Sequence, residues 1–235
     1  MILRRIEGSR FSEVAPLWGG LTAVILAGGP SLTHEQVALV RGAREGSTVR
    51  VLAVNDAYLL APWADVQYAA DSQWHAWMQK GVAKPVLGLT AEDVRHRWAS
   101  FAGQKCSIES SGRIEDDAVH LLRNKTFPNH SLGLSLDPRA LVTGRNSGFQ
   151  ALNLAILAGA KLVILLGFDG QRSAEGKDHF HGGHPQPTPP AAYPLYRQAM
   201  SAAENAIKAA GVMVLNCSPG SAIDSFPKVA LKEAL

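Results

Sequence analysis

The chain has few of the features that mark secreted, disulfide-bonded or membrane-spanning proteins. It contains only two cysteines, Cys106 and Cys217, and their separation matches no metal-binding or redox spacing. Unpaired thiols are typical of a reducing compartment. No apolar run approaches the ~18 residues of a membrane span, and Met1 to Phe11 lack the apolar stretch of a signal peptide. We therefore expect a cytoplasmic protein with no membrane contact.

A strong excess of one charge is also missing. Lys and Arg number 23 against 20 Asp and Glu, which gives a formal net charge of +3, and no dense basic run accompanies this excess. Such a balance permits an anionic ligand but gives only weak support to a nucleic-acid surface.

Several catalytic signatures are absent as well. The sequence has neither a Walker lysine after its glycine loop nor a strict G-x-G-x-x-G pattern, which disfavours P-loop kinases and standard dinucleotide enzymes. It has no G-x-S-x-G elbow of a serine hydrolase. It also has no Asp-x-Asp pair to carry a divalent metal beside a nucleotide-sugar. Any transferase here is expected to work without a metal.

What the sequence does contain is an alternation of strands and helices. Apolar runs rich in β-branched residues predict buried parallel strands, and segments with helical spacing lie between them. We expect a single α/β domain over residues 1–235, with a Rossmann-like, doubly wound and mostly parallel sheet. The predicted strands are Thr22 to Ala27, Val49 to Val54, Leu162 to Leu166 and Val212 to Leu215; the predicted helices are Glu35 to Arg44, Ser147 to Ala158 and Ala191 to Ala210.

Two stretches are expected to depart from this pattern. Residues 85–138 are less regular and predict an insertion or short antiparallel pieces. Residues 170–190 predict a flexible lid loop, because Gly182 to Pro190 holds four prolines and two glycines and cannot continue a helix.

The candidate site lies where the strands end, because doubly wound folds bind ligands beyond the carboxyl ends of their strands. Glycines let the backbone approach a ligand, free N–H groups at a helix start attract phosphate, and Asn or Asp can read a ribose or base. A tight turn or a helix cap is the alternative at each position. The nucleotide-binding candidates are Gly28, Gly29, Pro30, Ser31, Asn55, Asp56, Asn146, Ser147, Gly148, Gly167, Asp169, Ser218 and Ser221.

A histidine-rich loop follows the third strand. His179, His181 and His184 stand within six residues, after Asp178. Imidazoles and a carboxylate are ligands that zinc or iron would choose, but glycines do not fix them on one face as H-E-x-x-H would. A general base is the favoured alternative, since histidine titrates near neutrality. A solvated loop without chemistry is the third interpretation.

The ordered blocks after the strands resemble the bacterial sialyltransferase-type Rossmann-like family. Its relatives include Maf-type flagellin glycosyltransferases, archaeal hydroxymethylpterin diphosphokinase and phage proteins labelled norphogenetic, to which this chain looks closest. The resemblance rests on these blocks: Gly28 to Leu32, Val54 to Asp56, Asn146 to Gly148, Leu165 to Asp169, Gly183 with His184, and Cys217 with Ser218 and Ser221.

The resemblance implies that the glycine loop, Asn55 and the Asn146 to Gly148 helix start hold a nucleotide. It implies His184 as the general base, ahead of His181. The sialyltransferases carry tyrosines after this strand that support the leaving phosphate, and Gly170 to Lys177 contains none, so the donor sugar stays open.

The leading hypothesis is a metal-independent, glycosyltransferase-like enzyme that needs no cofactor and uses a CMP- or UDP-linked sugar donor. A second hypothesis is an ATP- and Mg²⁺-dependent pyrophosphokinase for a pterin-like alcohol, with Asp56, Asp71 or Asp169 at the metal. A third is a non-catalytic, nucleotide-binding phage assembly protein in a host cytoplasm. The acceptor is left open among a glycan, a small molecule and DNA, and a homo-oligomer is compatible with the sequence.

Overall fold

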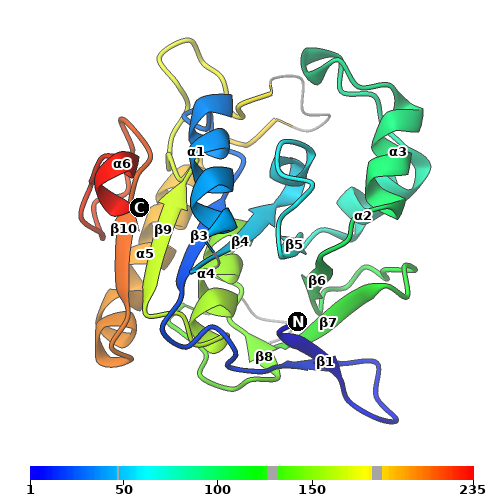
Figure 1. Cartoon of the computed structure of the whole chain (residues 1–235), viewed down its shortest axis with the longest axis horizontal. Coiled ribbons are helices and arrows are strands. Elements are labelled where there is room, and N and C mark those ends of the chain that lie inside the picture. The colour runs from blue at the N-terminus through cyan, green and yellow to red at the C-terminus, as the bar shows by residue number, and fades with distance from the viewer. Residues whose placement is uncertain (47, 126–131, 182–186) are drawn as a thin grey trace.

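A computed structural model of the chain describes residues 1–46, 48–125, 132–181 and 187–235 (Figure 1). The chain forms an α/β fold around an eight-stranded sheet in which all neighbouring strands are parallel. In spatial order the strands are β10 (Met213–Asn216), β9 (Leu162–Leu166), β3 (Thr22–Leu26), β4 (Val49–Val54), β5 (Val66–Tyr68), β6 (Gln104–Ile108), β7 (Val119–Asn124) and β8 (Ala140–Leu141). The predicted Rossmann-like, doubly wound architecture is confirmed.

Helices cover both faces of the sheet, and each face has its own apolar core. On one face lie α4 (Ser147–Leu157), α5 (Ala192–Ala209) and an antiparallel hairpin of β1 (Leu3–Arg5) and β2 (Ser12–Val14). On the other lie α1 (His34–Glu45), α2 (Ser72–Lys80), α3 (Ala91–Ala99) and α6 (Leu231–Ala234), together with the 3-10 helices η1 (Asn55–Leu59) and η2 (Pro85–Leu87). Figure 1 shows α1 in front of the sheet and α5 behind it.

The order of the strands creates a switch point between β3 and β9. From β3 the chain builds the sheet outward through β4, β5, β6, β7 and β8, then returns through α4 to place β9 on the other side of β3. The helices that follow β3 and β9 therefore lie on opposite faces of the sheet, and the carboxyl edge at such a switch point is where doubly wound folds bind ligands.

Helix α4 connects β8 to β9, and its burial holds this connection in place. Its residues from Gly148 to Ile156 are all buried, because it packs on β3 and β4 and against α5. The polar side chains inside it are satisfied: Gln150 accepts a hydrogen bond from the Tyr68 hydroxyl (2.8 Å), and Asn153 accepts from the amides of Ser135 and Val142. A helix in such a buried position is expected to be mostly apolar, with partners for its few polar side chains.

The stretch 85–138 differs from the expectation of short antiparallel pieces. It supplies α3 and the strands β6 and β7, which pair in parallel with their neighbours. The sequence pattern does not predict β6, because Gln104 and Lys105 interrupt its apolar run. Both residues are nevertheless buried. Gln104 bonds to the backbone of Leu3, and the Lys105 ammonium lies 4.1 Å from the centre of the Trp98 ring.

Residues 182–186 of the expected lid loop lie outside the described part of the chain. Among the helices that the structure describes, none combines the length and apolar character needed to cross a bilayer.

Candidate functional site

A cavity of about 400 Å³ opens at the carboxyl edge of the sheet, over the switch point. We call it the site cavity. Its walls come from residues 27–30 after β3, 54–56 after β4, 167–171 after β9 and 145–148 at the start of α4. Side chains of α2 and α5 close it, together with His179 and His181.

Most of the predicted site residues are brought together by this arrangement. The cavity is lined by Gly28, Gly29, Pro30, Asn55, Asp56, Asn146, Ser147, Gly148, Gly167, Asp169 and His181. Ser31, Ser218 and Ser221 are not among its lining residues. His184 lies outside the described residues.

The glycine loop after β3 touches the loop after β9. The amide of Gly29 donates to the carbonyl of Gly167 (3.0 Å), and both the amide and the hydroxyl of Ser31 donate to the Asp169 carboxylate (3.2 and 3.0 Å). A Cβ on Gly29 would lie 2.0 Å from Asp169 Oδ2 and 2.3 Å from the Gly167 oxygen. Only glycine at position 29 permits the two loops to lie this close. Ser31 stabilises the contact by donating hydrogen bonds to the Asp169 carboxylate.

Asp169 is nearly buried at this junction. Burial raises its pKa above the ordinary value of an aspartate, while the hydrogen bonds from Ser31 act in the opposite direction. The carboxylate therefore belongs to the contact between the two loops and is a fixed acceptor in the cavity wall.

Two residues in the cavity wall have a left-handed backbone. Asn55 has φ +50° and Arg145 has φ +56°, and among the described residues no other non-glycine residue has a positive φ. Asn tolerates this region, whereas Arg is rare there. Strained backbone clusters at ligand sites. Since both residues line the site cavity, this strain coincides with the candidate site.

The start of α4 offers an anion-binding edge. Asn146 caps the helix by accepting a hydrogen bond from the amide of Phe149 (3.1 Å), and Ser147 and Gly148 face the cavity with it. A Cβ on Gly148 would lie 2.9 Å from the Phe168 ring, so glycine also permits close packing here. The N–H groups and positive dipole of a helix start favour phosphate, and the exposed Arg145 side chain stands at the same edge.

A buried charged cluster forms the other wall. Asp56 accepts hydrogen bonds from Trp74 Nε1 (2.8 Å, at Oδ1), Lys84 Nζ (2.5 Å, at Oδ2) and His181 Nε2 (2.9 Å, also at Oδ2). The side chains of Asp56, Lys84 and His181 are 3–4% exposed. Burial alone would raise the pKa of Asp56, but the hydrogen bond from His181 and the charge of Lys84 outweigh it and lower that pKa well below its ordinary value.

Hydrogen bonds and a ring contact hold the histidine loop in place. The amide of Phe180 donates to the carbonyl of Gly28 (3.1 Å), and the rings of His179 and His181 stack with centroids 5.6 Å apart. Asp178 accepts hydrogen bonds from Arg172 Nε and the Tyr193 hydroxyl, both at 2.6 Å. Burial and this carboxylate raise the pKa of Tyr193 to about 12, so its phenol stays protonated at the cavity.

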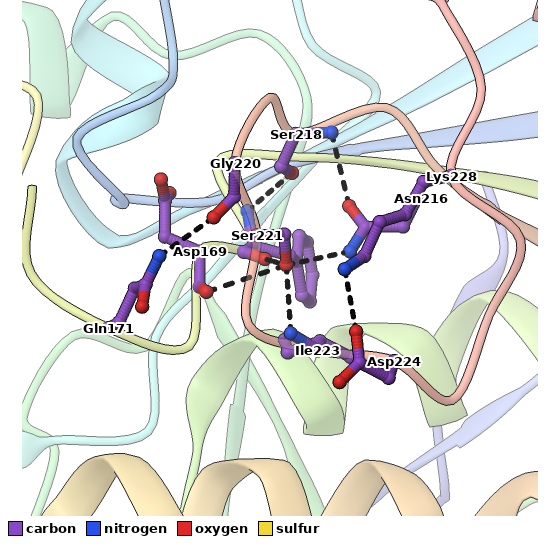
Figure 2. A network of polar contacts seen from close by, with 10 residues as sticks. Asp169, Gln171, Asn216, Ser218, Gly220, Ser221, Ile223, Asp224 and Lys228 are labelled. Carbon is purple, nitrogen blue, oxygen red and sulfur yellow. Dashed lines mark hydrogen bonds and ion pairs between the residues drawn. The ribbon is translucent and has the colours of Figure 1, made fainter.

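Ser218 and Ser221 belong to a network of polar contacts around the end of β9 (Figure 2). Ser218 Oγ accepts a hydrogen bond from the amide of Phe168 (2.8 Å), and Ser221 Oγ donates to the Phe168 carbonyl (2.6 Å). Asn216 Nδ2 and the amide of Ile223 donate to the same Ser221 oxygen. Both serines are buried, and they fix the strand end that presents Asp169.

Sequence reasoning missed Lys84 and the role of Trp74 as a partner of Asp56. Trp74 belongs to α2 and Lys84 follows that helix, 18 and 28 residues after Asp56, and no local pattern in the sequence connects either of them to Asp56. The tyrosines Tyr193 and Tyr196 were also missed, because nothing in the sequence of the predicted helix shows which of its side chains line the cavity.

The interpretation of the histidine loop as a metal site has no support among residues 1–46, 48–125, 132–181 and 187–235. Within these ranges no group of three His, Cys, Asp and Glu side chains is arranged to hold a metal ion. His184, the third histidine of the proposed ligand set, lies outside them. Cys106 and Cys217 are buried free thiols.

Replacement of Gly29 by alanine is expected to destabilise the fold by about 1–3 kcal/mol, the usual cost of overpacking. The added methyl cannot be accommodated unless the two loops separate. Gly42→Ala is the matched control: Gly42 lies on the exposed side of α1 with open space around it, and alanine there should stabilise by about 0.5–1 kcal/mol. Urea denaturation measures both. Equal effects for the two variants would contradict the close contact of the loops.

Comparison with protein-family models gives no match, and comparison with curated proteins gives none either.

Proposed function

We propose that the site cavity binds a nucleotide-activated sugar and that the chain transfers this sugar to an acceptor hydroxyl, with His181 as general base. The observation that carries the proposal is the buried pair of Asp56 and His181, which faces the same cavity as the glycine loop and the start of α4. A phosphate-binding edge opposite an oriented imidazole is the arrangement that such a transfer needs.

The hydrogen bond to Asp56 selects the tautomer of His181. A carboxylate only accepts hydrogen bonds, so the imidazole nitrogen that faces it, Nε2, must carry a proton. In the neutral ring the lone pair then resides on Nδ1, which is the nitrogen that can accept a proton. Asp56 thereby acts as the orienting group of a histidine base, as carboxylates do in catalytic triads.

Each bond that forms in the proposed transfer is matched by one that breaks. The acceptor oxygen forms a bond to the anomeric carbon, and its proton moves to His181 Nδ1. The bond between the anomeric carbon and the donor phosphate breaks, and its electron pair leaves with the nucleotide. The amides at the start of α4 and the Arg145 guanidinium lie where they can stabilise the charge on that phosphate. His184 remains a second candidate for the base.

Metal-dependent pyrophosphoryl transfer is less well supported. It would need Asp56, Asp71 or Asp169 to hold Mg²⁺. Asp56 is paired with Lys84 and His181, Asp169 with Ser31, and Asp71 caps α2 through the amide of Gln73 (2.9 Å). These existing partners favour the metal-independent transfer.

A thermal-shift screen against CMP, UDP, ATP and their sugar-linked forms, with and without Mg²⁺, tests the proposal. A pyrimidine nucleotide at 100 times its Kd should stabilise the fold by about 2.7 kcal/mol, with no need for Mg²⁺. Stabilisation by ATP that depends on Mg²⁺ would favour the pyrophosphokinase, and the absence of any shift would overturn the nucleotide site. Binding without turnover of any sugar donor would favour the non-catalytic assembly protein.

Arg145→Asn gives the screen a matched variant pair. Asparagine tolerates the left-handed backbone of this position, so the fold should survive while the guanidinium is lost. A charge-assisted contact to phosphate contributes about 1.5–3 kcal/mol, and the Kd for the nucleotide should rise at least about tenfold. Arg41→Gln, on the exposed side of α1, should leave the Kd unchanged.

A further inference from the structure

Three buried polar side chains beneath α2 have unmet hydrogen bonds, and the proposed chemistry does not use them. Gln67 and Ser107 are 0% exposed, and His75 is 1% exposed. In the described part of the chain, both amide atoms of Gln67, Nδ1 of His75 and Oγ of Ser107 have no hydrogen-bond partner. We infer that these side chains form an internal water-binding site between β5, β6 and α2. The inference is independent of the proposed function.

The register of the sheet brings two of these side chains to one face. Gln67 of β5 pairs with Lys105 of β6, and Ser107 lies two positions further along β6. Side chains two positions apart on a strand share a face. The Lys105 ammonium lies against the Trp98 ring of α3, so this is the face that α2 and α3 cover. Gln67 and Ser107 are therefore diagonal neighbours there, one strand spacing of about 4.8 Å and two residues apart.

His75 reaches the same face from α2. Its Nε2 lies 3.0 Å from the carbonyl oxygen of Ala69, two residues after Gln67. A carbonyl only accepts hydrogen bonds, so Nε2 carries the proton, and Nδ1 of the neutral ring is an acceptor. Burial lowers the pKa of His75, which favours the neutral ring. The His75 ring packs edge-on against Trp98, the ring that Lys105 also contacts, with centroids 5.6 Å apart. The three side chains thus surround one region between the helix and the sheet.

The mixture of donors and acceptors identifies the ligand as water. The Gln67 amide offers two N–H donors and one acceptor oxygen, His75 Nδ1 offers an acceptor, and Ser107 Oγ can both donate and accept. An anion would satisfy only the donors, and a cation only the acceptors. Buried waters make about three hydrogen bonds each, so one or two molecules suffice. Without them the buried polar atoms would lose their hydration with no compensation, which is costly.

The water-binding site supports the helix that forms one wall of the site cavity. Trp74 of α2 lines this cavity and donates a hydrogen bond to Asp56. His75 is the next residue, and the two rings pack edge-on with centroids 5.3 Å apart. Water bound at His75 therefore helps to hold α2, and with it Trp74, on the sheet.

Magnetisation transfer between water and the side-chain amide protons of Gln67, measured by NMR on the whole chain, tests the site. The amide signals are assigned by through-bond correlation to the backbone. Water held inside the protein exchanges slowly and should give NOE cross peaks to Gln67 with the sign typical of the protein interior. The amide of Gln79, on the exposed side of α2, is the internal reference and should show only the weak effect of surface water. A Gln67 amide without slowly exchanging water would overturn the inference.

Gln67→Met adds a readout whose sign separates a hydrated amide from a bare one. Methionine keeps the length of the side chain and removes its polar atoms. Loss of the bridge leaves His75 Nδ1 and Ser107 Oγ unsatisfied, so Tm should fall by about 4–8 °C. An amide without any partner would instead be relieved, and a Tm that rises or stays the same would overturn the inference. Ser107→Ala should also lower Tm, and Gln79→Met should leave it unchanged.

The two measurements together exclude a dry arrangement of the same side chains. If Gln67 were bonded directly to Ser107 or His75, Gln67→Met would lower Tm but the wild-type amide would show no slowly exchanging water. That combination would overturn the inference. Should Gln67→Met fail to fold, the wild-type cross peaks and Ser107→Ala still decide.

Discussion

Replacement of Asp56 by asparagine is expected to lower the free energy of unfolding by about 3–5 kcal/mol, the cost of removing one partner from a buried ion pair. Asparagine retains an oxygen for the Trp74 indole, but it leaves the Lys84 ammonium in the interior without its counter-charge and weakens the hold on His181. Urea denaturation gives the free energies. The control Asp224→Asn breaks an exposed pair with Lys228 and should leave the urea midpoint unchanged.

The pH dependence of the free energy of unfolding also tests whether Asp56 is ionised and paired in the folded protein. The pKa of Asp56 is lower in the folded chain than in the unfolded one. A depressed pKa contributes stability above the unfolded pKa of about 3.9, and this contribution is lost as the pH falls below that value. The free energy of unfolding of the wild-type protein should therefore fall steeply below about pH 4, and Asp56→Asn should show a shallower slope in this range.

Asp169 acts with the opposite sign, because its folded pKa is raised. It is present in both proteins, so the difference between wild type and Asp56→Asn cancels its effect. Identical slopes for the two proteins would mean that Asp56 is not ionised and paired as the structure describes.

His181→Gln is expected to reduce kcat by about 10²–10⁴-fold, the usual contribution of a general base. Glutamine preserves the approximate size and can still donate to Asp56, so the nucleotide Kd should change little. Steady-state rates at saturating donor and acceptor measure the first quantity, and calorimetric titration measures the second. His34→Gln, at the exposed start of α1, is the matched control and should retain full activity.

His184→Gln in the same assay separates the two candidate bases. A loss of turnover in His184→Gln with full activity in His181→Gln would assign the base to His184 and leave His181 a structural partner of Asp56. The reverse result would support the tautomer argument made from the Asp56 contact.

The fold was largely predictable because its central strands are almost entirely apolar, with Arg50 the one charged residue in Val49–Val54. Val49–Val54 and Leu162–Leu166 are buried on both faces of a parallel sheet, and such strands need no polar alternation. The strand β6 was not predictable, because Gln104 is tolerated inside through the distant backbone of Leu3, and Lys105 through Trp98 of the preceding helix. Polar residues in a strand signal exposure unless those partners are known.

The site was predictable to the level of which loops meet, but not to the level of which way side chains point. Asp56 and Ser221 both follow strands, yet Asp56 lines the cavity and Ser221 bonds to the backbone of Phe168 behind it. Both residues lie in the segment that follows a strand, and the sequence does not show which of them faces the cavity. Lys84 could not be foreseen for a related reason, since it reaches Asp56 from a loop 28 residues further along the chain.

The switch point between β3 and β9 has a consequence for the order in which the molecule can assemble. Thr22 pairs with Leu162, and the cavity needs the loops that follow both strands. Such distant pairing carries a high contact order, and loop closure must precede it. A chain that has only emerged as far as β8 can form one flank of the sheet but has no second wall for the cavity. The cavity is therefore completed near the end of folding, so a nucleotide bound there, as proposed, would report a completed fold and would not promote its early steps.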